Sequence, residues 1–173
     1  MLDRVKESLF NILRDAVAEN RVLDLFSGSG ALGLEALSRG ARSCVFVEQD
    51  RRLARLVMEN AQHCKLADRC ELVQADALEL AHRRPTVAGV PADLVLAGPP
   101  YAMVGDPNQR ALLFGALEGM VGAWIAPDAL VVLHHEPIPH AVWPTAAFNQ
   151  TDRRIYGRSQ LTFLQPVRRR TNG

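Results

Sequence analysis

Apolar residues in this chain recur in two patterns, and each pattern predicts a different kind of element. Apolar residues at three- and four-residue steps fall on one face of a helix at residues 3–18, with Asp3 placed to cap its start: Val5, Leu9, Ile12, Leu13 and Val17. Further helices are expected at residues 31–39, 50–64, 76–83 and 108–121. Short, mostly apolar runs between turn residues predict buried strands at residues 21–26, 44–47, 70–74, 93–97 and 129–134.

The order of these elements indicates the fold class. Strands that alternate with helices form right-handed βαβ units, which give a parallel sheet covered by helices. Near the end of the chain, residues 153–156 and 160–164 flank Gly157, Arg158 and Ser159, a pattern typical of an antiparallel hairpin. We therefore expect an α/β fold of Rossmann-like type, with a central, mostly parallel sheet of seven strands, helices on both faces and a C-terminal antiparallel hairpin. Its 173 residues suit a single domain over residues 1–173.

Polar, Gly or Pro residues follow four of the expected strands. They are residues 27–30, Glu48, Asp76 and residues 98–101. Ligands of open α/β sheets bind beyond the carboxyl ends of the strands. We expect these four groups to meet at one edge of the sheet and to form the functional site.

The segment after the first strand indicates a nucleotide-like cofactor. Gly28, Gly30 and Gly33 fit G-x-G-x-x-G between a strand and a helix, and Glu48 follows 20 residues after Gly28, where an acid can accept both hydroxyls of a ribose. Two cofactors fit this pattern, a nicotinamide dinucleotide and S-adenosylmethionine. Asp24 favours the second, because an acid suits a ligand with an ammonium and a sulfonium better than a pyrophosphate.

The stretch that begins at Asp24 resembles motif I of class I S-adenosylmethionine methyltransferases, D-x-F-x-G-x-G, and Asp76-Ala77 resembles their adenine site. This resemblance implies the class I methyltransferase fold. It also implies S-adenosylmethionine as the cofactor and S-adenosylhomocysteine as the product. The cofactor-binding residues implied are Asp24, Phe26, Ser27, Gly28, Ser29, Gly30, Glu48, Gln49, Asp76 and Ala77.

The segment after the fourth strand resembles motif IV of methyltransferases that act on amino groups, [D/N]-P-P-[Y/F]. The implied catalytic residues are Gly98, Pro99, Pro100 and Tyr101. In such a motif, the first side chain and a backbone carbonyl accept the two N–H bonds of the target amine, and the aromatic ring stacks on the base. Gly98 offers no side-chain acceptor, and Asp93 is about 16 Å away along the strand. We expect a weakened enzyme; a silent S-adenosylmethionine-binding protein is the alternative.

Two longer stretches resemble the RsmD family of 16S rRNA guanine-N2 methyltransferases: residues 3–13, DRVKESLFNIL, and residues 23–40, LDLFSGSGALGLEALSRG. The resemblance implies transfer of a methyl group to the N2 amine of a guanine in the small ribosomal subunit or its assembly intermediate. Methylation of another amino group, in DNA adenine or protein glutamine, is a further alternative, although no DNA substrate is expected. The basic N-terminal extension of the family is not found before Asp3. Phosphate contacts are expected from Arg153, Arg154, Arg158 and residues 168–170.

Composition and charge add little to this hypothesis. Hydrophobic residues make up 48% of the chain, charged residues 23%, and the net charge is +1, as in ordinary globular proteins. With no apolar run of about 20 residues and no secretory signal, we expect no membrane contact and a cytoplasmic location, with a monomer as the default.

Cys44, Cys64 and Cys70 lack metal-binding spacing, and His134 and His135 point to opposite faces of a strand. We therefore expect no metal.

Overall fold

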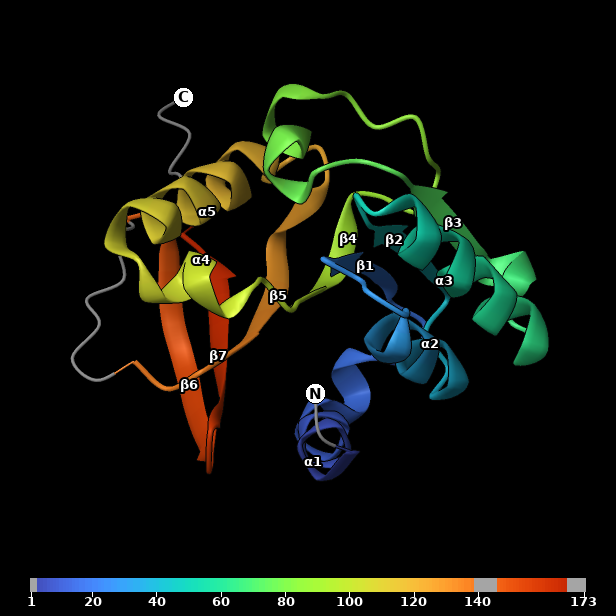
Figure 1. Ribbon diagram of the computed structural model, residues 1–173, viewed down its shortest axis with the longest axis horizontal. Helices are drawn as coiled ribbons and strands as arrows, with labels where there is room; N and C mark the ends of the chain where they lie inside the picture. Colours follow the sequence, from blue (N-terminus) through green and yellow to red (C-terminus); the bar gives the residue numbers. More distant parts are fainter. Residues whose placement is uncertain (1–2, 139–145, 168–173) are drawn as a thin grey trace.

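The computed structural model describes residues 3–138 and 146–167 and contains a sheet of seven strands (Figure 1). The strands lie in the order β3-β2-β1-β4-β5-β7-β6, with β1 to β5 parallel and β7 antiparallel to both of its neighbours. The strand bounds are β1 Arg21–Leu25, β2 Ser43–Val47, β3 Cys70–Val73, β4 Ala92–Ala97, β5 Ile125–His135, β6 Phe148–Tyr156 and β7 Ser159–Pro166. The expected mostly parallel sheet with a C-terminal hairpin is confirmed.

Helices cover both faces of the sheet, and each face has its own apolar core. One core joins α1, α2 and α3 to the sheet, and the other joins the short helix η3, α4 and α5 to it. The α-helices are α1 Asp3–Leu13, α2 Ala31–Ser38, α3 Arg51–His63, α4 Tyr101–Gly105 and α5 Pro107–Met120. The 3-10 helices are η1 Arg14–Ala16, η2 Ala67–Arg69 and η3 Ala77–His82. None of the helices in the described part of the chain is long and apolar enough to cross a membrane.

Several elements differ from the sequence-based expectation: β5 begins at Ile125, four residues before the expected strand, and the expected helix at residues 76–83 is the 3-10 helix η3. The first helix ends at Leu13, because Arg14 has a φ of 29° and the chain tightens into η1. An additional helix, α4, starts at Tyr101, directly after the Gly-Pro-Pro segment. The hairpin is longer than expected, since β6 is an edge strand whose mostly exposed residues show no apolar alternation.

The carboxyl ends of the parallel strands lie at one edge of the sheet. Backbone hydrogen bonds extend the ladder beyond the strands: the Ser27 amide donates to Val47 O, and the Gly98 amide donates to Leu25 O. The tip of the β6–β7 hairpin reaches the same edge, because β7 runs antiparallel to β5 and starts opposite its end, with Gln160 beside His135. The hairpin projects beyond the rest of the sheet (Figure 1).

Helix α2 packs very closely on this sheet at Gly33. A Cβ atom at this position would overlap the Phe46 ring and lie 2.6 Å from Cys44 Sγ, both on β2. Below the helix, the buried Asp24 of β1 accepts a hydrogen bond from the Gly33 amide through Oδ2 at 2.9 Å. The pKa of Asp24 is raised to about 8, mainly by burial; the hydrogen bond from the Gly33 amide opposes this shift, and the nearby Glu48 carboxylate adds to it.

Replacing Gly33 by Ala tests the close packing of α2. We expect Gly33→Ala to lower the free energy of unfolding by about 1–3 kcal/mol, because the added methyl group forces the helix away from Phe46. Gly115→Ala in α5 is the matched control: its Cβ meets nothing within 4 Å, so Ala there stabilises the helix by up to about 1 kcal/mol. Denaturant unfolding measures both, and equal effects of the two variants would contradict this packing.

Replacing Asp24 by Asn tests its raised pKa. The folded state holds a proton on Asp24 that the unfolded state releases, so wild-type stability falls as the pH rises between about 3.8 and about 8. Asparagine does not titrate and keeps an oxygen for the Gly33 amide. The stability of Asp24→Asn relative to wild type therefore rises with pH in this window, by up to about 1.4 kcal/mol per pH unit. Unfolding curves measured across the window test this, and a constant difference would contradict it.

Candidate active site

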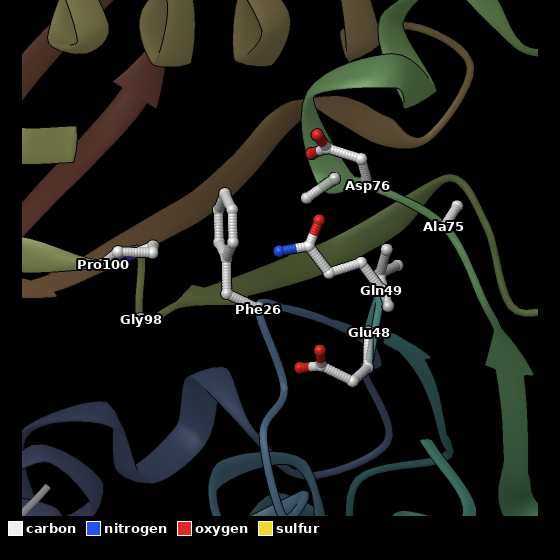
Figure 2. A pocket seen from close by; sticks show the side chains of 9 residues that line it. Phe26, Glu48, Gln49, Ala75, Asp76, Gly98 and Pro100 are labelled. Carbon is white, nitrogen blue, oxygen red and sulfur yellow. The ribbon is translucent and has the colours of Figure 1, made fainter. Parts of the chain in front are cut away.

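A cleft of about 190 Å³ lies at the carboxyl edge of the sheet (Figure 2). Residues at the ends of four parallel strands, β1 to β4, form its wall. They are Phe26, Val47, Glu48, Gln49, Ala75, Asp76, Ala77, Gly98 and Pro100. The cleft therefore brings together members of three of the four groups that the sequence placed after strands, Glu48, Asp76 and the segment 98–101. The fourth group, residues 27–30, does not line the cleft; its neighbour Phe26 does.

The turn after β1 enters the cleft through a strained residue. Phe26 has a φ of 58°, in the left-handed region that a bulky side chain avoids at a cost of about 1–3 kcal/mol. This conformation directs its ring into the cleft, between Pro100 and Gln49 (Figure 2). Such strain persists where the surrounding structure enforces it, and it is often found at binding sites.

Glu48 connects the turns that follow β1 and β2. Its Oε2 accepts a hydrogen bond from the Gly28 amide and its Oε1 accepts one from the Asp50 amide, both at 2.8 Å. The residue is only 7% exposed, yet it lines the cleft. Each carboxylate oxygen has two lone pairs, so each retains acceptor capacity for a ligand after bonding one amide.

Asp76 caps a short helix and also lines the cleft. Its Oδ1 accepts a hydrogen bond from the Leu78 amide at 2.9 Å and so caps η3. The side chain also lines the cleft beside Ala77, which is buried.

The opposite end of the cleft is formed by Gly98 and Pro100, where a Cβ atom on Gly98 would meet nothing within 4 Å. Gly98 therefore leaves open space that a side chain could fill.

Other expected site residues lie around the cleft and not in its wall. Asp24 lies below the turn and faces Gly33, and Ser27 is occupied internally, since its Oγ donates to Asp24 O at 2.7 Å. Tyr101 begins α4 and is 53% exposed. The remaining residues outside the wall are Gly28, Ser29, Gly30 and Pro99.

Two residues of the wall were missed by the sequence analysis. Val47 is the last residue of β2, and Ala75 precedes Asp76. Both are small or medium apolar residues within or beside strands, and only their position next to Glu48 and Asp76 could have indicated a role. They give the cleft an apolar wall.

The hairpin arginines stand near acidic side chains. Arg154 Nε lies 2.9 Å from Asp152 Oδ2, and Arg158 Nη2 lies 3.3 Å from Glu136 Oε1. The Arg158 side chain is 93% exposed, whereas residues 168–170 lie outside the described residues. Within residues 3–138 and 146–167, no group of three or more His, Cys, Asp or Glu side chains is arranged to hold a metal ion.

Comparison with known structures places this fold among methyltransferases. The Escherichia coli protein yhhF has a TM-score of 0.76 and 29% identity, over 95% of this chain and 85% of that one. An RNA methyltransferase from Salinibacter ruber, crystallised with S-adenosyl-L-homocysteine, has a TM-score of 0.67 and 19% identity, over 99% and 97% of the two chains. The seven-stranded sheet with its antiparallel hairpin is thus a class I methyltransferase fold.

Curated relatives and a family model match most of the chain. The Escherichia coli protein named "Ribosomal RNA small subunit methyltransferase D" is 33% identical over 135 residues, which span 78% of this chain and 62% of the relative. The protein of the same name from Haemophilus influenzae is 32% identical over 78% of this chain and 66% of the relative. The model of the family described as "Conserved hypothetical protein 95" matches residues 1–165. The chain therefore belongs to this family, which is the RsmD family that its motifs resemble.

Proposed function

We propose that this protein is a methyltransferase whose cleft binds S-adenosylmethionine. The observation that carries the proposal is the convergence of Glu48, Asp76 and Gly98 in one cleft. The hydrogen-bond acceptors fit the cofactor: the retained lone pairs of Glu48 can accept from the ribose hydroxyls, and Asp76 can accept from the adenine amino group. Phe26 and Ala77 supply apolar walls for the adenosine. A cofactor of this kind, bound to a neighbour of the same fold, supports the assignment.

The backbone of Gly28, Ser29 and Gly30 adjoins the cofactor end of the cleft through the hydrogen bond from the Gly28 amide to Glu48. Gly28 and Gly30 have φ values of 57° and 81°, which turn the chain sharply between β1 and α2. Ser27 stabilises this turn, because its Oγ lies 2.7 Å from Asp24 O and 3.0 Å from Val47 O, and the two carbonyls share its single hydroxyl proton. In this proposal Asp24 acts indirectly: it fixes the Gly33 end of α2 and so the position of the turn.

The proposed substrate is the N2 amine of a guanine in 16S rRNA, within the small ribosomal subunit or an assembly intermediate. The names of the curated relatives support an rRNA substrate. The methyl carbon leaves the sulfonium sulfur, which keeps the electron pair, and bonds to the amine nitrogen, which then releases one proton. The exposed Tyr101 ring stacks on the base. A backbone carbonyl of the Gly98–Pro100 segment accepts an N–H bond of the amine; Pro100 O already accepts one hydrogen bond from the Met103 amide, which leaves it one lone pair.

Gly98 also favours a second candidate function, a protein that binds S-adenosylmethionine without turnover. Without a side-chain acceptor at this position, the amine has fewer groups to orient its lone pair. Loss of one such group lowers a rate by about 10²–10³, so slow turnover and no turnover are distinguishable only by assay.

Methyl transfer to small ribosomal subunits that lack the modification tests the proposed function. The protein is incubated with labelled S-adenosylmethionine, the RNA is digested, and the labelled nucleosides are identified. The expected product is N2-methylguanosine. A labelled methyladenosine, or label on ribosomal protein only, would contradict the proposed substrate.

The Gly98→Asp variant tests the role of the missing side chain. We expect it to methylate up to about 10²–10³ times faster than the natural chain, because the carboxylate fits the open space and accepts an N–H bond of the amine. Gly105→Asp, where a Cβ also meets nothing within 4 Å but which does not line the cleft, is the matched control for added charge. Equal rates for Gly98→Asp and the natural chain would rule out this explanation of Gly98.

A further inference from the structure

His134 is a buried titratable residue at the carboxyl edge that the cleft does not use. It lies at the end of β5, is 7% exposed, and its Nε2 is 3.3 Å from Ser159 Oγ at the hairpin tip. No other hydrogen bond of its ring is found among the described residues. Its place in the sequence was considered only for metal binding, and the proposed function so far gives the His134 side chain no role.

The strand register places His134 beside Gly98. Ala97 of β4 pairs with Leu133 of β5 in parallel, so Gly98 and His134 are the next residues on the two neighbouring strands. The hydrogen bond from the Gly98 amide to Leu25 O keeps Gly98 in line with its strand. Neighbouring strands are about 4.8 Å apart. His134 therefore lies on the strand next to Gly98, the position that has no side-chain acceptor.

The two residues also share a face of the sheet. Ala97 and Leu133 belong to the apolar core under α5, whereas Leu96 and Val132 belong to the core under α1. Because side chains alternate along a strand, Gly98 and His134 follow Leu96 and Val132 onto the α1 face. A side chain at position 98 would enter open space on that same face.

The ring of His134 is suited to accept a hydrogen bond. Burial lowers the pKa of His134 to about 4, so the imidazole is neutral at pH 7. A neutral imidazole has one N–H donor and one nitrogen with a lone pair. In the tautomer that carries the proton on Nε2, this nitrogen donates to Ser159 Oγ and the lone pair of Nδ1 remains for a ligand; a ligand hydrogen bond accepted by His134 requires this tautomer. The contact with Ser159 fixes the orientation of the ring.

From this juxtaposition we propose that His134 accepts a hydrogen bond from the target amine, in place of the side chain that Gly98 lacks. The proposal rests on the proposed methyltransferase function and deepens it. Together with a backbone carbonyl of the Gly98–Pro100 segment, His134 would hold both N–H bonds of the amine and direct its lone pair toward the methyl group. His134 thereby becomes a catalytic residue that supplies part of the missing stabilisation, and a carboxylate at position 98 adds the remainder.

A double-mutant cycle between His134 and Gly98 tests this proposal. His134→Leu removes the acceptor and is expected to lower kcat about 10²–10³-fold with little change in KM or in the affinity for S-adenosylhomocysteine. His134→Gln, which keeps an acceptor oxygen, retains more of the activity. In the Gly98→Asp background, the loss caused by His134→Leu shrinks to less than about tenfold, because the new carboxylate supplies the acceptor.

His135→Leu is the matched control, because His135 is also buried but faces the opposite side of β5, where its Nε2 contacts Thr162. Any effect of His135→Leu on kcat is expected to be equal in the two backgrounds.

An equal loss from His134→Leu in both backgrounds would overturn the proposal in favour of a structural role. If the natural chain is inactive and the Gly98→Asp variant is active, the proposal for His134 fails while the proposed methyltransferase function stands. Silence of every variant, Gly98→Asp included, would overturn the proposed function as well.

Discussion

The carboxylate of Glu48 is the interaction on which the geometry of the cleft depends. It accepts the amide of Gly28 from the turn after β1 and the amide of Asp50 from the turn before α3, both at 2.8 Å. Removing it would leave two backbone donors without their partner and free both turns to move. Asp50 in turn caps α3 by accepting from the Arg52 and Leu53 amides. One carboxylate thus fixes two loops and still faces the ligand.

The same edge of the sheet contains two locally unfavourable features. Asp24 is fully buried with a raised pKa, and Phe26 has a left-handed backbone conformation. Neither contributes to stability in an obvious way: burial of an acid and a positive φ both cost free energy. Both are next to the turn that adjoins the proposed cofactor site. Their retention is understandable if the position of that turn matters more than the stability of the fold.

The sequence predicted the sheet and the location of the cleft because these depend on strong local signals. Short apolar runs define β1 to β4, and the Gly, Pro and acidic residues after them define their ends. The direction of Asp24 was not predicted, because a motif gives the spacing of residues and not the face on which each side chain lies. The length of β6 was also hidden, since an exposed edge strand needs no apolar alternation. The nearness of His134 to Gly98 required the register of β4 and β5.

The affinity for S-adenosylhomocysteine tests the central claim, that this cleft is a cofactor site fixed by Glu48. Calorimetric titration should show one-to-one binding to the natural chain and binding at least about tenfold weaker to Glu48→Gln, which cannot accept both amides. Glu79→Gln is the matched control, since Glu79 is an exposed residue of η3 outside the cleft wall, and its affinity should be unchanged. Absence of binding, heat from a nicotinamide dinucleotide instead, or an affinity that Glu48→Gln leaves unchanged would contradict the account.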